Sequence, residues 1–174
     1  ADHLFNGIEP IGVPRSLEGT ATPFTYGDLE ELEGLLQQQE GQLACIIMEP
    51  MRSGEPPAGY LDGVRDLATR YGVVLVFDEV SSGWRVAPGS AQEYVGVTPD
   101  MSVFAKAISN GYPMGAVVGK REFMEPASRM FISSAYWDDN IGIAASLACL
   151  RELERRDAVS HFNRIGALFK EQIN

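Results

Sequence analysis

The chain has 174 residues, 45% of them hydrophobic and 22% charged, a composition that suits a globular protein with a sizeable core. Its net charge of −10 argues against nucleic acid or an anionic membrane as the main partner, because both favour clustered lysine and arginine. No apolar run approaches the ~18–20 residues of a membrane span, and the first residues lack the basic and apolar regions of a signal peptide.

The two cysteines of the chain indicate a reducing cellular compartment. Cys45 and Cys149 both stand among apolar neighbours, which predicts buried thiols in a reducing environment and favours a cytoplasmic protein. The chain opens without methionine and stops at Asn174 inside a helical pattern. We therefore expect it to be part of something larger.

The first half of the chain predicts two helices and a strand. Residues 1–26 are rich in glycine and proline with little periodicity, which indicates an irregular lead-in. Residues 27–40 have leucines at helical spacing, acids in the first turn and a glycine after the end, which predicts a surface helix. Residues 43–48 are predicted to form a buried strand. Residues 60–71 place apolar side chains on one helical face, and Gly72 follows where a helix-ending glycine belongs.

Two short apolar runs then end abruptly on charged residues. Residues 73–77 lead into Asp78, and residues 101–105 lead into Lys106. Their length and their content of valine and phenylalanine predict strands buried on both faces of a parallel sheet. Because ligands bind beyond the carboxyl ends of strands in open α/β sheets, we expect Asp78 and Lys106 to emerge at one edge, where chemistry would take place.

The remaining elements complete an α/β pattern. Residues 114–118 are another strand candidate, and residues 140–156 and 158–173 are long helical patterns broken near Asp157. The order of strands and helices predicts an α/β fold.

Each charged residue at a strand end has two interpretations. An aspartate such as Asp78 most often caps a neighbouring loop, and a functional role is the less common alternative. Lys106 either packs its stem and extends its ammonium to solvent, or is held uncharged by burial so that it can form a Schiff base. Metal binding is not expected, because His3 and His161 lie far apart in sequence and lack companions at metal-ligand spacing.

Motifs in the second half resemble a known family. The runs in question are FDEVSSGWRV (residues 77–86), GSAQEYVGVTPD (89–100), FAK (104–106) and GYPMG (111–115). In this order they resemble the signature of the class III (ω-type) pyridoxal-phosphate aminotransferases. The similarity runs from about residue 46 to residue 124 and is strongest to glutamate-1-semialdehyde aminomutase and the aminotransferases that resemble it.

The resemblance implies a cofactor and a role for each site residue. The cofactor would be pyridoxal 5′-phosphate. Lys106 matches the lysine that forms the Schiff base and later moves the substrate proton. Asp78 matches the acid that pairs with the pyridinium nitrogen, and Val80 matches the small apolar residue packed against one face of the ring. We expect Glu79 to be structural or to act through its neighbours.

The resemblance also implies an architecture. The chain would be part of the large domain of a fold type I transferase, about two-fifths of a full-length member, with the cofactor-binding core in residues 27–156. Residues 157–174 would begin the helix that leads to a small C-terminal domain. A small-molecule amino donor and a carbonyl acceptor would be the substrates, and family members are homodimers.

Two family features do not match, and alternatives stay open. No stretch matches the glycine- and hydroxyl-rich loop that holds the cofactor phosphate. Where relatives place a phosphate-binding threonine, Ala135 stands between Ser134 and Tyr136, either of which would have to replace the hydroxyl. Aminotransfer is the preferred function, and semialdehyde aminomutation is the runner-up. The third alternative is a catalytically incomplete fragment that acts only as a fold or dimerisation unit.

Overall fold

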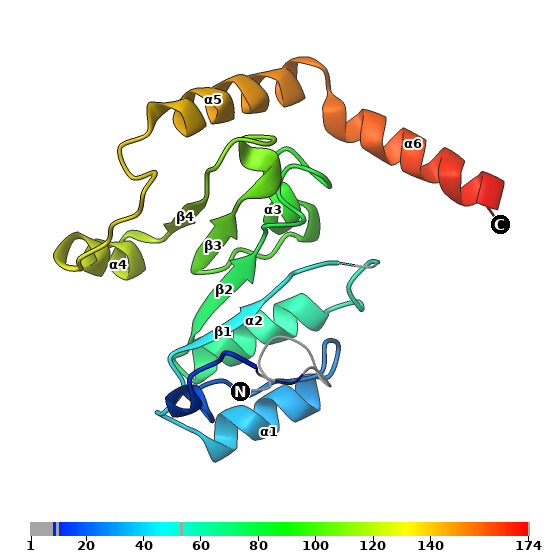
Figure 1. The fold of residues 1–174 in the computed structure, drawn as a ribbon. Helices are drawn as coiled ribbons and strands as arrows, with labels where there is room; N and C mark the ends of the chain where they lie inside the picture. Colours follow the sequence, from blue (N-terminus) through cyan, green and yellow to red (C-terminus); the bar gives the residue numbers. More distant parts are fainter. Residues whose placement is uncertain (1–8, 10, 53, 174) are drawn as a thin grey trace.

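A computed structural model describes residues 9, 11–52 and 54–173. Figure 1 shows the order and arrangement of the elements. The helices are α1 (Leu29–Gln38), α2 (Tyr60–Arg70), α3 (Ser90–Val95), α4 (Arg121–Met124), α5 (Asn140–Arg155) and α6 (Ala158–Ile173). The strands are β1 (Cys45–Met48), β2 (Val74–Asp78), β3 (Met101–Phe104) and β4 (Ala116–Gly119). Short 3₁₀ helices are η1 (Arg15–Leu17), η2 (Lys106–Ile108) and η3 (Glu125–Arg129).

The strands form one sheet of four in the order β1-β2-β3-β4. β1, β2 and β3 are parallel, with Met48 opposite Phe77 and Asp78 opposite Val103. β4 runs antiparallel to β3. The expected α/β class is therefore confirmed, with an antiparallel edge strand that the sequence pattern did not distinguish from the parallel ones.

Local signals explain the first two helices. The Asp28 carboxylate caps α1 by accepting a hydrogen bond from the amide of Glu31 at 2.9 Å. Gly72 follows α2 with a φ of +65°, a left-handed conformation that glycine adopts without steric cost. α2 packs against β2, and α1 packs against α2. Their apolar faces form the core with the sheet, in which the largest fully buried apolar side chains are Phe77, Leu36, Leu75 and Val64.

Burial differs between the strands. In β2, Leu75 and Val76 point to opposite faces of the sheet and both are buried, so the expectation of a strand buried on both faces is confirmed there. In β3 one face is buried and the other, with Met101 and Val103, is half-buried. The buried strand expected over residues 43–48 is buried on one face of β1 only, because Ile47 is 58% exposed and Cys45 is exposed as well. The helices cover only one face of β1, and every second side chain points the other way. Cys45 is therefore not the buried thiol that its neighbours suggested.

A buried acid fixes the amino-terminal edge of the sheet. Asp100 directly precedes β3, and its side chain is 5% exposed. One oxygen, Oδ2, accepts from the Leu75 amide at 2.8 Å and from Arg65 Nη1 at 2.9 Å, while Oδ1 accepts from Lys120 Nζ at 2.6 Å. Although burial alone would raise it, these hydrogen bonds hold the pKa of Asp100 below its ordinary value. The carboxylate thus connects α2, β2 and the end of β4.

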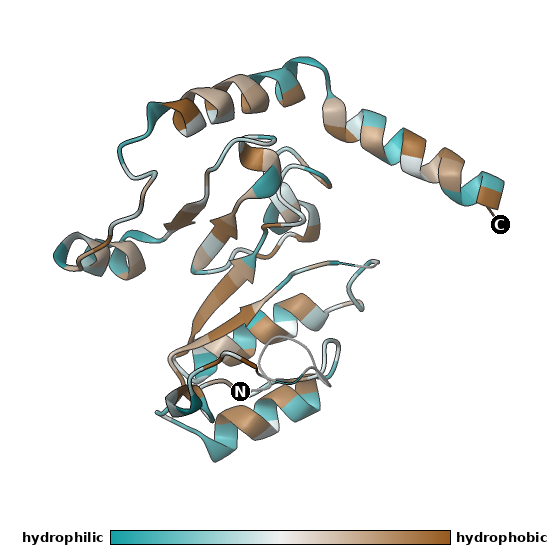
Figure 2. Ribbon diagram, in the orientation of Figure 1, coloured by the Kyte–Doolittle hydropathy of each residue, from teal (hydrophilic) through white to brown (hydrophobic). Residues whose placement is uncertain are grey.

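The C-terminal helices leave much of their apolar surface exposed. Asp157, with a φ of +47°, separates α5 from α6 at the predicted position. Figure 1 shows α6 extending away from the sheet, and Figure 2 shows apolar and polar residues mixed along both helices. Exposed large apolar side chains on them include Ile141, Leu147, Phe169 and Ile173. None of the helices in the described part of the chain has the length and apolar character that a membrane crossing requires.

Candidate active site at the carboxyl edge of the sheet

The two charged residues that end the apolar runs lie at the same edge of the sheet, as the sequence predicts. Asp78 is the last residue of β2 and pairs in register with Val103 of β3. β3 ends one residue later at Phe104, and Lys106 then begins η2. Because β2 and β3 are parallel, both residues emerge where the strands end.

Lys106 has an unusual backbone conformation. Its φ of +49° lies in the left-handed region, which costs a residue with a side chain on the order of 1–3 kcal/mol. The Lys106 carbonyl accepts a hydrogen bond from the Asn110 amide at 3.0 Å, which closes the turn. Such strain persists only where the surroundings require it, and it is found preferentially at functional sites.

The side chain of Lys106 is exposed, which agrees with the interpretation of an amine extended to solvent and not with that of an amine held uncharged by burial. The strand stops at Phe104, and the left-handed turn at Lys106 takes the chain out of the sheet. The amine is therefore placed beyond the strand ends, with its Nζ donating to Ser81 Oγ at 2.8 Å.

Asp78 is half-buried and has a partly local role. Its Oδ1 accepts a hydrogen bond from the amide of Val80 at 3.0 Å, the pattern by which an aspartate stabilises a turn two residues on. The loop-capping interpretation therefore holds for one carboxylate oxygen. The same bond places Val80, also half-buried, directly beside the acid.

Glu79 is fully buried and connects the turn to the next helix. Its Oε2 accepts from the Ala91 amide at 2.6 Å and from Ser82 Oγ at 3.2 Å, and its Oε1 accepts from the Gln92 amide at 3.4 Å. Burial raises the pKa of this carboxyl above its ordinary value, against the lowering effect of these hydrogen bonds. Glu79 thereby holds residues 80–90 against the end of β2, which agrees with the expected structural role.

Ser81 is the residue that sequence reasoning missed. It lies in the turn after Asp78, its hydroxyl accepts from Lys106 Nζ, and its carbonyl accepts from Arg85 Nη1. The available signal was a hydroxyl residue within three positions of a strand-ending acid. Without a register for β2 and β3, nothing linked Ser81 to a lysine 25 residues later.

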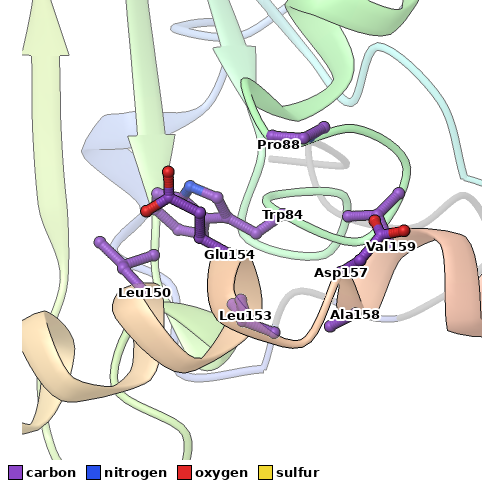
Figure 3. A pocket seen from close by; sticks show the side chains of 8 residues that line it. All are labelled: Trp84, Pro88, Leu150, Leu153, Glu154, Asp157, Ala158 and Val159. Atoms are coloured by element: carbon purple, nitrogen blue, oxygen red, sulfur yellow. The ribbon is translucent and has the colours of Figure 1, made fainter.

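A cavity next to the turn is separate from these residues. Its volume is about 330 Å³, and it lies between Trp84 and the junction of α5 and α6 (Figure 3). It is lined by Trp84, Pro88, Leu150, Leu153, Glu154, Asp157, Ala158 and Val159. Trp84 also packs on Phe104, with ring centroids 4.7 Å apart. Neither Asp78 nor Lys106 lines this cavity, so the chemistry of the edge lies outside it.

The residues at the carboxyl edge have the chemistry to hold a pyridine ring that carries an aldehyde. The Asp78 carboxylate suits a protonated ring nitrogen, and the small apolar side chain of Val80 suits a ring face. The exposed primary amine of Lys106 suits the aldehyde. In the segment where a phosphate-binding threonine was expected, Ser134 Oγ accepts a hydrogen bond from the amide of Tyr136 at 3.3 Å. Among the residues that the structure describes, no group of three or more histidine, cysteine or acidic side chains is placed to bind a metal ion.

The family model described as aminotransferase class-III matches residues 19–174. The chain therefore belongs to the class III aminotransferase family. Because the match covers most of the chain, it includes every residue of the carboxyl edge.

Individual relatives agree with this assignment. The chain is 40% identical over 151 residues to 3-aminobutyryl-CoA aminotransferase of Cloacimonas acidaminovorans, covering 83% of this chain and 36% of the relative. It is 39% identical over 150 residues to glutamate-1-semialdehyde 2,1-aminomutase of Geotalea daltonii, covering 82% and 35%. A solved structure of a transaminase with PLP bound is 28% identical and has a TM-score of 0.75, over 82% of this chain and 36% of that one. The chain thus spans about a third of the length of the relatives it matches.

Proposed function

We propose that the protein containing this chain is a pyridoxal-phosphate-dependent aminotransferase, which moves an amino group between an amine or amino acid and a carbonyl compound. The observation that carries the proposal is the emergence of Asp78 and Lys106 at one edge of the sheet, in a chain of the class III family. The similarity to a transaminase with PLP bound supports the choice of cofactor.

Each edge residue has a distinct task in this proposal. When bound, the cofactor supplies an electron-withdrawing ring that makes the substrate Cα–H bond acidic. The Asp78 carboxylate holds a proton on the ring nitrogen, and Val80 packs against the ring face. The Lys106 amine would hold the cofactor at its aldehyde end and, during the reaction, would take the proton from the substrate Cα and return it.

Aminomutation is the second candidate. The near-equal similarity to an aminomutase supports it. That reaction would use the same three residues, but the amino group would move within one molecule and no external carbonyl acceptor would be needed. A requirement for a second substrate therefore separates the two candidates.

We also propose that a small domain and a second subunit surround the site. The exposed apolar side chains of α5 and α6 and of the open face of β1 support further protein packing there, both from a small domain that α6 leads into and from the second subunit of a homodimer. A site completed in this way would gain the glycine- and hydroxyl-rich phosphate loop that no stretch of this chain matches. A cytoplasmic location suits such an enzyme.

The test measures amino transfer by the purified protein with and without a carbonyl acceptor. Lys106→Ala is expected to lower the turnover rate by about 10²–10⁴-fold, because the group that moves the substrate proton is lost. Asp78→Asn should lower it as well, since a neutral amide does not keep the ring nitrogen protonated. Lys170→Ala is the matched control, because Lys170 is an exposed lysine of α6.

Product analysis decides between the candidates. An amino group found on the added acceptor supports aminotransfer, and an isomerised substrate without an acceptor supports aminomutation. Equal activity in Lys106→Ala and Lys170→Ala would contradict both. No activity in the parent protein, with no incorporation of the cofactor at Lys106 after borohydride reduction, would favour the incomplete-fragment alternative.

A further inference from the structure

Ser81 has contacts that no role described so far requires. Its hydroxyl accepts a hydrogen bond from Lys106 Nζ at 2.8 Å, across the gap between the ends of β2 and β3. The two residues are 25 positions apart, so the contact depends on the sheet register. Within the part of the chain that the structure describes, it is the one hydrogen bond of the Lys106 amine.

The backbone of Ser81 is held from several directions. The Glu79 carbonyl accepts from the Gly83 amide at 2.9 Å, and the Ser82 carbonyl accepts from the Arg85 amide at 3.0 Å. The Arg85 guanidinium donates to the Ser81 carbonyl itself. A built Cβ on Gly83 would lie 2.8 Å from the Glu79 carbonyl, so the turn has room only for glycine there. The position of the hydroxyl is therefore determined by the turn.

The turn that contains Ser81 follows β2 directly and is also bound to β3. The Glu79 amide donates to the Val103 carbonyl of β3 at 2.9 Å, and the buried Glu79 carboxylate accepts from the amides of Ala91 and Gln92 in α3. Lys106, for its part, is held by its own left-handed turn. The two partners of the Ser81–Lys106 hydrogen bond thus both lie in turns that are closed by backbone hydrogen bonds.

From this arrangement we infer that Ser81 is a positioning residue that holds the Lys106 amine at the carboxyl edge beside Asp78. Its hydroxyl accepts from Lys106 Nζ and so selects one direction for a long, exposed side chain that would otherwise sample many rotamers. The inference rests on the proposed function, since it assigns the reacting group to Lys106. Ser81 acts through Lys106 and needs no contact with the substrate.

The experiment compares two labelling reactions in the purified protein. In the first, the cofactor-free protein is treated with limiting acetic anhydride, and peptide mass mapping gives the modification of Lys106 relative to Lys170. In the second, pyridoxal phosphate is added, borohydride is used to fix it, and the same ratio is measured. Lys106, Lys120 and Lys170 are the lysines of the chain, so each reaction carries an internal reference.

Ser81→Ala is expected to change the two ratios in opposite directions. Acetylation of Lys106 should rise about threefold to tenfold, because a small reagent meets an amine released from its hydroxyl partner. Capture of pyridoxal phosphate should fall about tenfold, because a released amine no longer points at the bound aldehyde. Ser81→Thr keeps the hydroxyl and should restore both ratios. Ser128→Ala is the matched control, because the exposed Ser128 hydroxyl also makes one hydrogen bond of 2.8 Å.

The outcomes separate this inference from the proposed function. Unchanged ratios in Ser81→Ala would overturn the inference, as would equal changes in Ser81→Ala and Ser81→Thr, which would assign the effect to the shape of the turn. Failure of the parent protein to capture pyridoxal phosphate preferentially at Lys106 would overturn the proposed function, and the inference with it. Circular dichroism of each variant shows whether the fold is retained, so that a folding defect is not taken for either result.

Discussion

Two buried carboxylates fix opposite ends of the same sheet by different means. Glu79 follows β2 at the carboxyl edge and is 0% exposed, and Asp100 precedes β3 at the amino edge and is 4% exposed. Glu79 binds neutral donors, namely two backbone amides and the Ser82 hydroxyl. Asp100 binds Arg65, Lys120 and one backbone amide. The pKa of the first is raised by burial, and the pKa of the second is lowered by its donors.

The two edges differ in the kind of donor that each buried carboxylate binds. At the amino edge, Arg65 and Lys120 around Asp100 stabilise the junction of α2, β2 and the end of β4. At the carboxyl edge, the Glu79 carboxylate holds the turn through the amides of Ala91 and Gln92 and the Ser82 hydroxyl, which are all neutral donors. The two basic side chains that contact Ser81 bind other atoms of the turn: Lys106 donates to the Ser81 hydroxyl, and Arg85 donates to the Ser81 carbonyl.

Asp100→Ala is expected to have the largest effect on stability. This change leaves Arg65 and Lys120 without their carboxylate and the buried Leu75 amide without its acceptor. We expect the free energy of unfolding at pH 7 to fall by about 3 kcal/mol, the low end of the effect of breaking a buried ion pair, because Lys120 is half exposed. Urea denaturation followed by circular dichroism measures it.

The matched control for that variant is Asp66→Ala. Asp66 lies next to Arg65 on α2 but is exposed, so a change within about 0.5 kcal/mol is expected. A loss of less than about 1 kcal/mol in Asp100→Ala would mean that the cations and the carboxylate do not stabilise the amino edge.

A smaller effect is expected for Glu79→Gln. The amide keeps one acceptor oxygen, but its NH₂ group faces a backbone N–H of Ala91 or Gln92, so one hydrogen bond is lost. The free energy of unfolding should fall by about 1–2 kcal/mol at pH 4.5. Glu93→Gln is the control, because the exposed Glu93 carboxylate also binds a backbone amide, that of Gly89, in the same segment.

The pH dependence sharpens the contrast, because the two shifts have opposite signs. Since the folded pKa of Glu79 is raised above 4.5, the folded parent binds more protons than the unfolded chain, and its advantage over Glu79→Gln should shrink as pH rises above about 4.5. Since the folded pKa of Asp100 is lowered below 3.8, the parent's advantage over Asp100→Ala should shrink as pH falls below about 3.8. Slopes of the same sign would contradict the assignment.

The smallest effect is expected at an exposed acid. Hydrogen bonds from Arg155 and then Arg156 lower the pKa of Glu152 to about 2, yet all three side chains lie in solvent on α5 and its C-terminal end. Because water and salt screen exposed ion pairs, Glu152→Gln should leave the free energy of unfolding unchanged within error. NMR titration of the unsubstituted protein should still show the low pKa of Glu152. A loss as large as that of Glu79→Gln would mean that a pKa shift, rather than burial, decides stability here.

Much of the fold could be predicted from local patterns. The expected helices over residues 27–40, 60–71, 140–156 and 158–173 agree with α1, α2, α5 and α6 to within about two residues at each end. Leucine spacing, the Asp28 cap and Gly72 act over a few residues, so they are visible without knowledge of the tertiary structure. The strand-ending positions of Asp78 and Lys106 were visible for the same reason.

Contacts between distant segments could not be predicted in this way. The exposure of Cys45 depends on which face of β1 the helices cover, and the antiparallel direction of β4 depends on how the chain returns after η2. The exposure of Lys106 follows from a left-handed turn at a residue type that rarely adopts one. The family resemblance assigned roles to Asp78, Val80 and Lys106, but it assigned none to Ser81.

The sequence by itself determined the α/β class, the helices and the acid and amine at the ends of two strands, because each depends on residues close together in the chain. Only the tertiary structure decided that Ser81 meets Lys106, that Glu79 holds the turn with neutral donors, and that Asp100 gathers Arg65 and Lys120 at the opposite edge. Apart from the local bond between Ser82 and Glu79, those contacts join residues 12 to 35 positions apart, and the tertiary fold brings them together.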